Sequence, residues 1–504
     1  MGKYLLGLDS GNTICKATIF DTEGNVVATS SARIPSYHPA QGHHERNLTE
    51  LWEYAAKTIR NVIAKADIWP GEIAAVGICG HGNGLYLLDK QKKVLRGIQS
   101  VDTRAAGICA EWEAAGLADK VYPYTRQKLW PAQTNSLLAW LKKEEPVTYE
   151  KIGTVFLSKD YLNFCLTGEI ASDYSDMSAT NLLDIERKNY NPALLDMYGL
   201  GDLLPDLPML KKSYEVIGKV TANAAIETGL MPGTKVVAGM IDVCANLIGS
   251  GICSPGQIGV IAGTWSVNAT LTDKPLVNND LAMSALFASP QYHISIEADA
   301  SSMTNLEWFV DQFCPTEKRR AKKAGISVFQ ICDQMVAAQV PRQDAPFYLP
   351  YLYGGNIHKN AKGGFFGLSG WHTKADMLWS LYEGIVFGHK YHIEKLQNAG
   401  IQNRSVRLTG GASGSGIFGQ LFADVLGMEV EICSCRETGT WGAAFSTGIG
   451  AGLYSSFQEL TPDIKVVFEP NLQNQALYQL RYELYKVLAT TIPEAIKKGW
   501  HKSF

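Results

Sequence analysis

Two turns of small residues, far apart in the sequence, carry groups that could do chemistry. The first follows an apolar strand that ends at Asp9, and the second follows another apolar strand that ends near residue 262. Glycine lets the backbone approach an anion closely, and successive N–H groups of such a turn can surround a phosphate. The candidate phosphate-binding residues are Ser10, Gly11, Asn12, Thr13, Gly263 and Thr264. Such a pair of turns predicts a protein that clasps a triphosphate from both sides.

Asp9 adds an acidic group at the mouth of the first turn. It cannot contact phosphate directly, because like charges repel. A carboxylate there can instead hold Mg²⁺, which takes oxygen ligands and bridges phosphates. The alternative interpretation is two ordinary hairpin turns, since acidic residues after short strands also form turns with their own side chains. Both turns together with Asp9 favour the nucleotide site.

The elements that must position these turns follow an α/β pattern. Residues 4–8, 14–20 and 25–29 predict a strand meander, and a helix with one apolar face begins at about residue 47. Near residue 235 a strand, a helix and another strand-turn-strand follow. This restart predicts a weak duplication of one α/β domain. We expect an N-terminal domain over 1–247 and a C-terminal domain over 248–504.

The composition permits an enzyme and argues against several other classes of protein. The chain has 504 residues, 46% of them hydrophobic and 19% charged, enough to bury a large core in two domains. Its net charge of −3 argues against a protein that coats nucleic acid. No apolar run approaches the roughly 20 residues of a membrane helix. The 10 cysteines are mostly scattered singly, which is typical of a reduced, cytoplasmic protein.

Further segments resemble the FGGY family of carbohydrate kinases, within the wider superfamily of sugar kinases, heat-shock ATPases and actin. Residues 363–368 and 376–384 follow one family signature almost position by position, with Leu381 as a mild departure. A second signature is degraded, because Leu137 stands where that pattern has Lys. The resemblance runs from residue 6 to about residue 454. It implies two actin-like ATPase (ribonuclease H-like) domains with a cleft between them, and ATP-dependent phosphorylation of a sugar hydroxyl.

The same resemblance implies roles for single residues. Asp242 matches the family's general base, which takes the proton of the sugar hydroxyl, and is a second candidate for the metal ion; an acidic residue before an apolar helix is also an ordinary N-cap. Lys16 stands where the family has a basic residue near the phosphates. A strand-to-helix stretch resembles the family's adenosine motif and supplies Gly410, Gly411, Ala412 and Ser415.

The sugar contacts of the family lie on the loop 80–84, which here carries His81 and Asn83. Asp102 and Trp130 are further candidates, for a hydroxyl contact and for the apolar face of a sugar. A histidine in a loop is otherwise usually a solvated residue. Glycerol kinases have Arg and Glu at positions 82 and 83, which disfavours glycerol. Stretches such as 261–265 are similar to the L-xylulose kinases, so L-xylulose is the expected substrate, with D-xylulose, erythritol and glycerol as alternatives.

Two other classes of protein are alternatives. Gly414, Gly416 and Gly419 satisfy the G-x-G-x-x-G pattern of NAD-binding dehydrogenases, although the preceding strand ends too early for that fingerprint. A non-enzymatic ATP-driven switch would share the Asp9 turn but needs neither a sugar loop nor a base.

The expected ligands are ATP, Mg²⁺ and a small sugar, with no nucleic acid and no membrane. The sequence leaves the oligomeric state open, with a homodimer as the candidate.

Overall fold

The computed structural model describes residues 2–278, 280–339, 341–355, 357–358, 361–403, 405–459 and 461–500. The chain forms two compact units, and each is assembled from separate stretches of sequence. Unit 1 comprises Met1–Pro255, Leu271–Ser295 and Glu437–Pro462. Unit 2 comprises Gly256–Thr270, Ile296–Arg436 and Asp463–Phe504.

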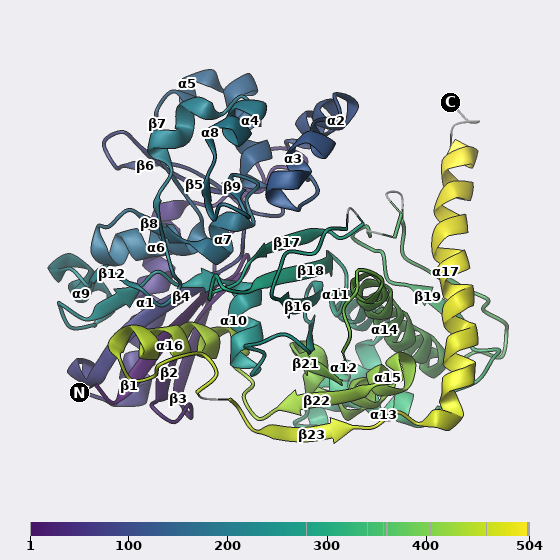
Figure 1. The fold of residues 1–504 in the computed structure, drawn as a ribbon. Helices are drawn as coiled ribbons and strands as arrows, with labels where there is room; N and C mark the ends of the chain where they lie inside the picture. Colours follow the sequence, from purple (N-terminus) through teal and green to yellow (C-terminus); the bar gives the residue numbers. More distant parts are fainter. Residues whose placement is uncertain are drawn as a thin grey trace. The chain divides into compact units, whose positions relative to one another are not determined.

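A mixed sheet in the order β12-β13-β4-β1-β2-β3 forms the centre of unit 1, and β14 also pairs with β4. Figure 1 labels β12, β4, β1, β2 and β3 of this sheet. These strands are β1 (Tyr4–Ser10), β2 (Ile14–Asp21), β3 (Val26–Arg33), β4 (Ile73–Gly80), β12 (Val216–Lys219), β13 (Lys235–Val237) and β14 (Met240–Ile241). The first three form the expected antiparallel meander. β1, β13 and β14 all run parallel to β4, so the carboxyl ends of these strands share one edge of the sheet.

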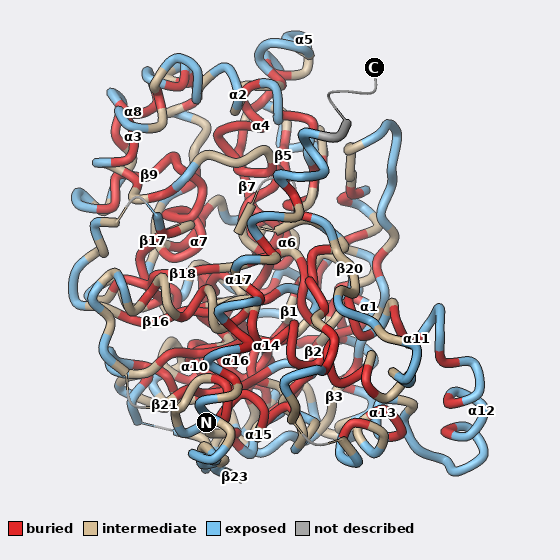
Figure 2. Tube along the Cα trace, turned by 90° about the vertical axis from the view of Figure 1, so that its right-hand side faces the viewer, coloured by how far each residue is buried: buried red, intermediate tan, exposed pale blue. Residues whose placement is uncertain are grey.

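Helices pack on this sheet because their apolar positions share one face. The expected helix near residue 47 is α1 (Leu48–Ala66); it starts at Asn47, whose side chain accepts hydrogen bonds from the N–H groups of Thr49 and Glu50. The buried side chains of α1 pack against the sheet. Most residues of β1 and β2 are buried (Figure 2). The other unit 1 helices that concern the site are α6 (Ser158–Thr167), α7 (Tyr174–Ser178), α10 (Asp242–Gly249) and α16 (Thr438–Ala451).

α16 comes from the far end of the chain and packs against β1, β4 and α10. Two glycines allow this close approach. A Cβ atom at Gly7 would lie 1.9 Å from the carbonyl oxygen of Thr440, and one at Gly442 would lie 2.0 Å from that of Ala245. Any larger residue at either place would therefore push α16 away from its neighbours.

A second apolar cluster in unit 1 lies around the three-stranded sheet β6-β5-β7. Its elements are β5 (Leu85–Asp89), β6 (Val94–Ile98), β7 (Ile152–Phe156), α2 (Ala106–Ala114), α3 (Leu117–Thr125), α4 (Thr134–Glu144), α5 (Pro146–Tyr149) and α8 (Pro192–Met197). Smaller elements complete the unit: β8 (Ala171–Asp173), β9 (Leu183–Asp184), β10 (Asn189–Tyr190), β11 (Met209–Lys211), α9 (Ala222–Thr228) and β17 (Met283–Leu286).

Unit 2 is built on the strands β16-β15-β21-β22-β23 of a second seven-stranded sheet. Its elements are β15 (Ile258–Ala262), β16 (Ser266–Thr272), β18 (His293–Asp299), β19 (Phe347–Leu349), β20 (Gly364–Phe366), β21 (Ser405–Thr409), β22 (Glu429–Cys433), β23 (Ile464–Phe468), α11 (Thr304–Phe313), α12 (Pro315–Ala324), α13 (Val328–Ala337), α14 (Lys374–Asn398), α15 (Gly416–Leu426) and α17 (Leu472–Trp500). β15 and β16 form a hairpin, and β15 also runs parallel to β21. The hairpin of β1 and β2 beside parallel β4 has the same arrangement, as the predicted duplication requires.

α14 and α17 pack together in unit 2 through a buried ion pair. The guanidinium Nη2 of Arg481 lies 2.6 Å from Oε2 of Glu383. α14 follows its N-cap Thr373, and Asp376 completes a capping box there.

None of the described helices combines the length and the apolar character that a membrane span requires.

Candidate active site

Two carboxylates meet at the edge of the unit 1 sheet where the parallel strands end. Asp9 lies opposite Cys79 on β4, and Met240 on β14 lies opposite the same Cys79. Asp242 follows β14 directly as the first residue of α10. Two positions that are 233 residues apart in the chain (242 − 9 = 233) therefore come to the same edge.

Both carboxylates hold protons more tightly than a solvated aspartate. Burial raises the pKa of Asp242 to about 7, and the neighbouring charge of Asp9 contributes. Burial also raises the pKa of Asp9, to about 6, against the lowering effect of Lys16. A carboxylate whose pKa lies near neutral pH is suited to accept a proton as a general base.

Lys16 lies opposite Asp9 in the β1–β2 hairpin. Its Nζ atom is 2.9 Å from Oε2 of Glu437, the residue just before α16. Lys16 is therefore near the expected phosphate turn, but it is paired with an acid from the far end of the sequence. Glu437 was not predictable from the sequence, since nothing in the local pattern links it to the hairpin.

The first turn offers fewer free side chains than its sequence suggested. The Ser10 hydroxyl is buried and lies 2.8 Å from the Ser158 hydroxyl. Asn12 Nδ2 donates to Ser100 Oγ at 2.9 Å. Gly11 and Thr13 remain at least partly exposed. Among residues 10–13, Thr13 is the one that is exposed, whereas Ser10 is fully buried.

The loop 80–84 brings His81 and Asn83 together, but both side chains are buried. His81 Nε2 lies 2.7 Å from the Tyr86 hydroxyl, and Nδ1 lies 3.0 Å from Ser100 Oγ. Burial lowers the pKa of His81 to about 4, so its ring is neutral at pH 7. Asn83 has the left-handed φ of 63°, and its Oδ1 accepts from the Thr134 N–H at 3.3 Å.

Asp102 and Trp130 occupy different settings. Asp102 Oδ1 accepts from Arg104 Nε at 3.0 Å, and Oδ2 accepts from the His44 N–H at 2.6 Å. Arg104 also pairs with Glu45 at 2.9 Å, which makes a buried ion-pair network. Trp130 is partly buried, and its backbone N–H donates to Gln133 Oε1 at 3.2 Å. The carboxylate of Asp102 is thus largely occupied within the protein.

A buried charge cluster packs behind the loop 80–84 and was not anticipated from the sequence. Lys159 Nζ lies 2.5 Å from Asp160, 3.0 Å from Asp173 and 3.7 Å from Asp176. A Cβ atom at Gly82 would lie 3.4 Å from Asp176 Oδ1. A family segment at 173–184 was visible in the sequence, but the pairing with Lys159 was not.

Asp176 is the unusual member of this cluster. Neither of its carboxylate oxygens has a hydrogen-bond partner among the described residues. Burial raises its pKa well above the usual range, and the nearby charge of Asp242 adds to the shift. The neighbouring Ser175 hydroxyl accepts from the N–H of Ile241, the residue before Asp242. The cluster therefore supports the backbone that presents Asp242.

In unit 2, the structure brings the predicted nucleotide residues to one sheet edge. Ile261 on β15 lies opposite Thr409 on β21, so Gly263 and Gly410 follow neighbouring parallel strands. A Cβ atom at Gly410, whose φ is 80°, would lie 3.1 Å from the Gly263 nitrogen. Thr264 is exposed. The turn at Gly263 and the stretch at Gly410 are far apart in the sequence and adjacent in the structure.

Other members of this edge are engaged locally. The Ser415 hydroxyl caps α15 by accepting from the Phe418 N–H at 3.3 Å. Gly411 begins a short 3₁₀ turn in which Ala412 is buried. Within the G-x-G-x-x-G match, a Cβ atom at Gly419 would lie 2.4 Å from the Phe468 ring. That glycine is thus required by packing, and β21 ends well before the match.

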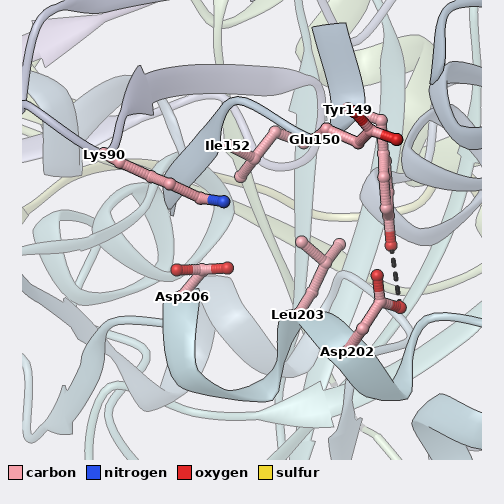
Figure 3. Close-up of a pocket in the computed structure, with 7 residues that line it drawn as sticks. All are labelled: Lys90, Tyr149, Glu150, Ile152, Asp202, Leu203 and Asp206. Carbon is pink, nitrogen blue, oxygen red and sulfur yellow. Dashed lines mark hydrogen bonds between the residues drawn. The ribbon is translucent and has the colours of Figure 1, made fainter. Parts of the chain in front are cut away.

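A surface cavity of about 470 Å³ lies elsewhere in unit 1 (Figure 3). Its lining residues are Lys90, Tyr149, Glu150, Ile152, Asp202, Leu203 and Asp206. Its Tyr149 hydroxyl donates to Asp202 Oδ1 at 3.1 Å. None of these residues belongs to the site described above.

Comparison with known proteins decides the class. Residues 4–249 match the N-terminal domain of the FGGY family of carbohydrate kinases, and residues 259–451 match its C-terminal domain. The chain belongs to this family. It is therefore an ATP-dependent kinase of sugars with the two-domain α/β fold of the actin-like ATPases, as the sequence predicted. Family membership thus favours the kinase over the dehydrogenase and the non-enzymatic switch.

Individual relatives of this FGGY kinase cover nearly its whole length. The L-xylulose/3-keto-L-gulonate kinase of Escherichia coli (strain K12) is 34% identical over 507 residues, covering 99% of this chain and 98% of that protein. The probable L-xylulose kinase of Pasteurella multocida (strain Pm70) is 34% identical, covering 97% and 99%. The crystal structure of a xyloylose kinase from Brucella ovis has a TM-score of 0.85 at 26% identity, covering 97% and 99%.

Proposed function

We propose that this FGGY kinase transfers the γ-phosphoryl group of ATP to a terminal hydroxyl of a ketopentose, with L-xylulose as the substrate. The observation that carries the proposal is Asp242 beside Asp9 at the sheet edge, with a pKa of about 7. The L-xylulose/3-keto-L-gulonate kinase of Escherichia coli and the probable L-xylulose kinase of Pasteurella multocida support the choice of sugar. D-xylulose, erythritol and glycerol are the alternatives.

Asp242 acts as the general base in this proposal. Its carboxylate accepts the proton of the terminal hydroxyl as the oxygen bonds to phosphorus and the bond to ADP breaks. The transition state of phosphoryl transfer is loose, so the orientation of the hydroxyl matters more than early proton removal. After transfer Asp242 holds the proton, which a pKa near 7 permits without a large energetic cost.

Asp9 and Asp242 are the proposed metal ligands. Two neighbouring carboxylates with raised pKa values fit a divalent cation, because its charge would offset their mutual repulsion. No group of three or more His, Cys, Asp or Glu side chains suited to a metal occurs among the described residues. Mg²⁺ characteristically uses one or two carboxylates together with substrate phosphates, and bound there it would neutralise phosphate charge.

Backbone groups and a few side chains are the proposed nucleotide contacts of each unit. In unit 1 the proposed contacts are Ser10, Gly11, Asn12, Thr13 and Lys16. In unit 2 they are Gly263, Thr264, Gly410, Gly411, Ala412 and Ser415. The exposed Thr13 and Thr264 supply hydroxyl donors, whereas the hydroxyls of Ser10 and Ser415 are already engaged.

The sugar would lie against the loop 80–84, with His81, Asn83, Asp102 and Trp130 as the proposed contacts. That loop carries no charged side chain. Two cations of unit 1, Arg104 and Lys159, are paired with buried carboxylates, whereas the buried Arg46 donates to the carbonyl oxygens of Pro35 and Asn12. The neutral His81 and Asn83 suit sugar hydroxyls, because each side chain can donate or accept a hydrogen bond. A cytoplasmic location, a homodimer and a domain boundary between residues 247 and 248 remain further proposals.

A coupled assay of ADP release tests the proposed function. The panel is L-xylulose, D-xylulose, L-ribulose, erythritol and glycerol, each compared by kcat/KM. The proposal expects L-xylulose to give the highest value. A higher value for another sugar would replace the substrate, and no sugar-dependent ADP release at all would overturn the catalytic proposal.

A further inference from the structure

We infer that Ser100 and Tyr86 are positioning residues that link the loop 80–84 to the turn 10–13 through His81. This inference rests on the proposed function, which assigns that loop to the sugar and that turn to the nucleotide. The link would make the binding of one substrate change the binding of the other.

One arm of the link runs through Ser100. Asn12 Nδ2 in the turn donates to Ser100 Oγ at 2.9 Å. The same Ser100 oxygen lies 3.0 Å from Nδ1 of His81 in the loop. Ser100 and His81 are both buried, so water does not readily replace either hydrogen bond. A single hydroxyl thus joins one side chain of each segment.

The other arm runs through Tyr86 and returns to the same turn. His81 Nε2 lies 2.7 Å from the Tyr86 hydroxyl, which is fully buried on β5. Tyr86 also interacts with the side chain of Ser158, and the Ser158 hydroxyl lies 2.8 Å from that of Ser10. The His81 N–H donates to the Ser10 carbonyl oxygen at 3.2 Å. His81 is therefore held on both ring nitrogens by groups that lead to the turn.

The chemistry of His81 suits a link of this kind. Its lowered pKa keeps the ring neutral, with one donor and one acceptor nitrogen. Hydroxyl groups lie on both sides, and each can donate or accept, so either tautomer satisfies both contacts. A sugar that draws His81 toward itself must break one of these bonds, and a buried group left without a partner is costly.

The backbone of the turn is held at the Asn12 carbonyl oxygen. A movement of His81 would therefore act on the side chain of Asn12 rather than on its backbone. The Asn12 carbonyl oxygen accepts from Gln99 Nε2 at 2.9 Å and from the guanidinium of Arg46. A rearrangement at His81 would therefore reach the Asn12 side chain through Ser100 and reach Ser10 through Tyr86 and Ser158. Reciprocity requires the nucleotide to alter sugar affinity by the same factor.

Calorimetric titration with ADP and Mg²⁺, with and without saturating L-xylulose, tests the link. The wild-type enzyme is expected to show at least about a 5-fold difference in ADP affinity between the two conditions. Ser100→Ala and Tyr86→Phe should bring that ratio close to one. Ser136→Ala removes a buried hydroxyl of α4 outside the link and should keep the wild-type ratio. A wild-type ratio of one, or an unchanged ratio in both variants, would overturn the inference.

A second measurement does not depend on the sugar. Tyr86→Phe removes only a hydroxyl, and the link predicts that it weakens ADP binding about 2–10-fold without any sugar present. Unchanged ADP affinity in this folded variant would mean that Tyr86 merely fills the core. A protein that binds ADP as predicted but phosphorylates none of the sugars would overturn the proposed function while keeping the link.

Discussion

Asp9 and Asp242 lie at one edge of the unit 1 sheet, and the charge of Asp9 raises the pKa of Asp242. The relationship follows from strand register, since Asp9 and Met240 both lie opposite Cys79 on β4 and Asp242 follows two residues after Met240. Asp9, the proposed cation ligand, thus raises the pKa of Asp242, the proposed general base, toward neutral pH.

Asp242→Asn should lower kcat about 10²–10⁴-fold, because it removes the general base but keeps the shape of the side chain. Steady-state ADP release measures the loss. ADP affinity, measured separately, should stay within a few-fold of wild type as the control for folding. A variant with near wild-type kcat would show that Asp242 only starts α10.

The pH dependence of kcat/KM should show an acid limb with a midpoint near pH 7, because Asp242 must be ionised to accept the proton. Asp9→Asn removes the neighbouring charge and should shift that midpoint to lower pH, whatever its effect on the rate. Asp21→Asn, at the far end of the β1–β2 hairpin, is the matched control and should leave the midpoint unchanged. A midpoint that stays near 7 in Asp9→Asn would contradict the coupling.

Asp242→Asn should also make the protein more stable above pH 7. The folded protein keeps the Asp242 proton up to about pH 7, whereas the reference value of the group is 3.8. Between these values ionisation favours the unfolded chain, so wild-type stability falls as the pH rises and then levels off. Thermal melts should show an advantage for the variant that is absent near pH 4 and reaches on the order of 1 kcal/mol at pH 8. An equal advantage at both pH values would contradict this assignment.

Lys159→Met should destabilise unit 1 by about 3–5 kcal/mol, because it leaves three buried carboxylates without their cation. Denaturant unfolding at pH 7 measures this. Lys142→Met removes a half-exposed cation paired with Asp202 and should cost about 0–1 kcal/mol. Similar costs for the two variants would mean that the cluster already holds enough protons to need no cation.

Gly7→Ala should destabilise the protein by several kcal/mol, since its Cβ would overlap the Thr440 carbonyl oxygen and displace α16. Gly107→Ala in α2, where a Cβ meets nothing within 4 Å, is the control and should stabilise by about 0.5–1 kcal/mol. Thermal melts compare the two. A tolerated Gly7→Ala would show that α16 can move away at little cost.

Much of the fold followed from local patterns. The β1–β2–β3 meander, the start of α1 at Asn47 and the long helix α14 were all predictable, because periodicity and capping depend on residues close in sequence. The G-x-G-x-x-G match could be set aside on local grounds as well, because the preceding strand ends too early, but the reason for its third glycine was not predictable. The packing role of Gly419 depends on Phe468 of β23, about fifty residues further along the chain, which no local pattern reveals.

By itself, the sequence determined the kinase family, the two turns, and the acids that follow β strands. These features need only a residue and its neighbours, or a signature shared with relatives. Only the tertiary structure decided which polar groups are already engaged. Ser10 pairs with Ser158, and Lys16 with Glu437, because a buried or crowded polar group takes the partner that packing brings to it. Such partners lie more than one hundred residues away in the chain, and no local pattern specifies them.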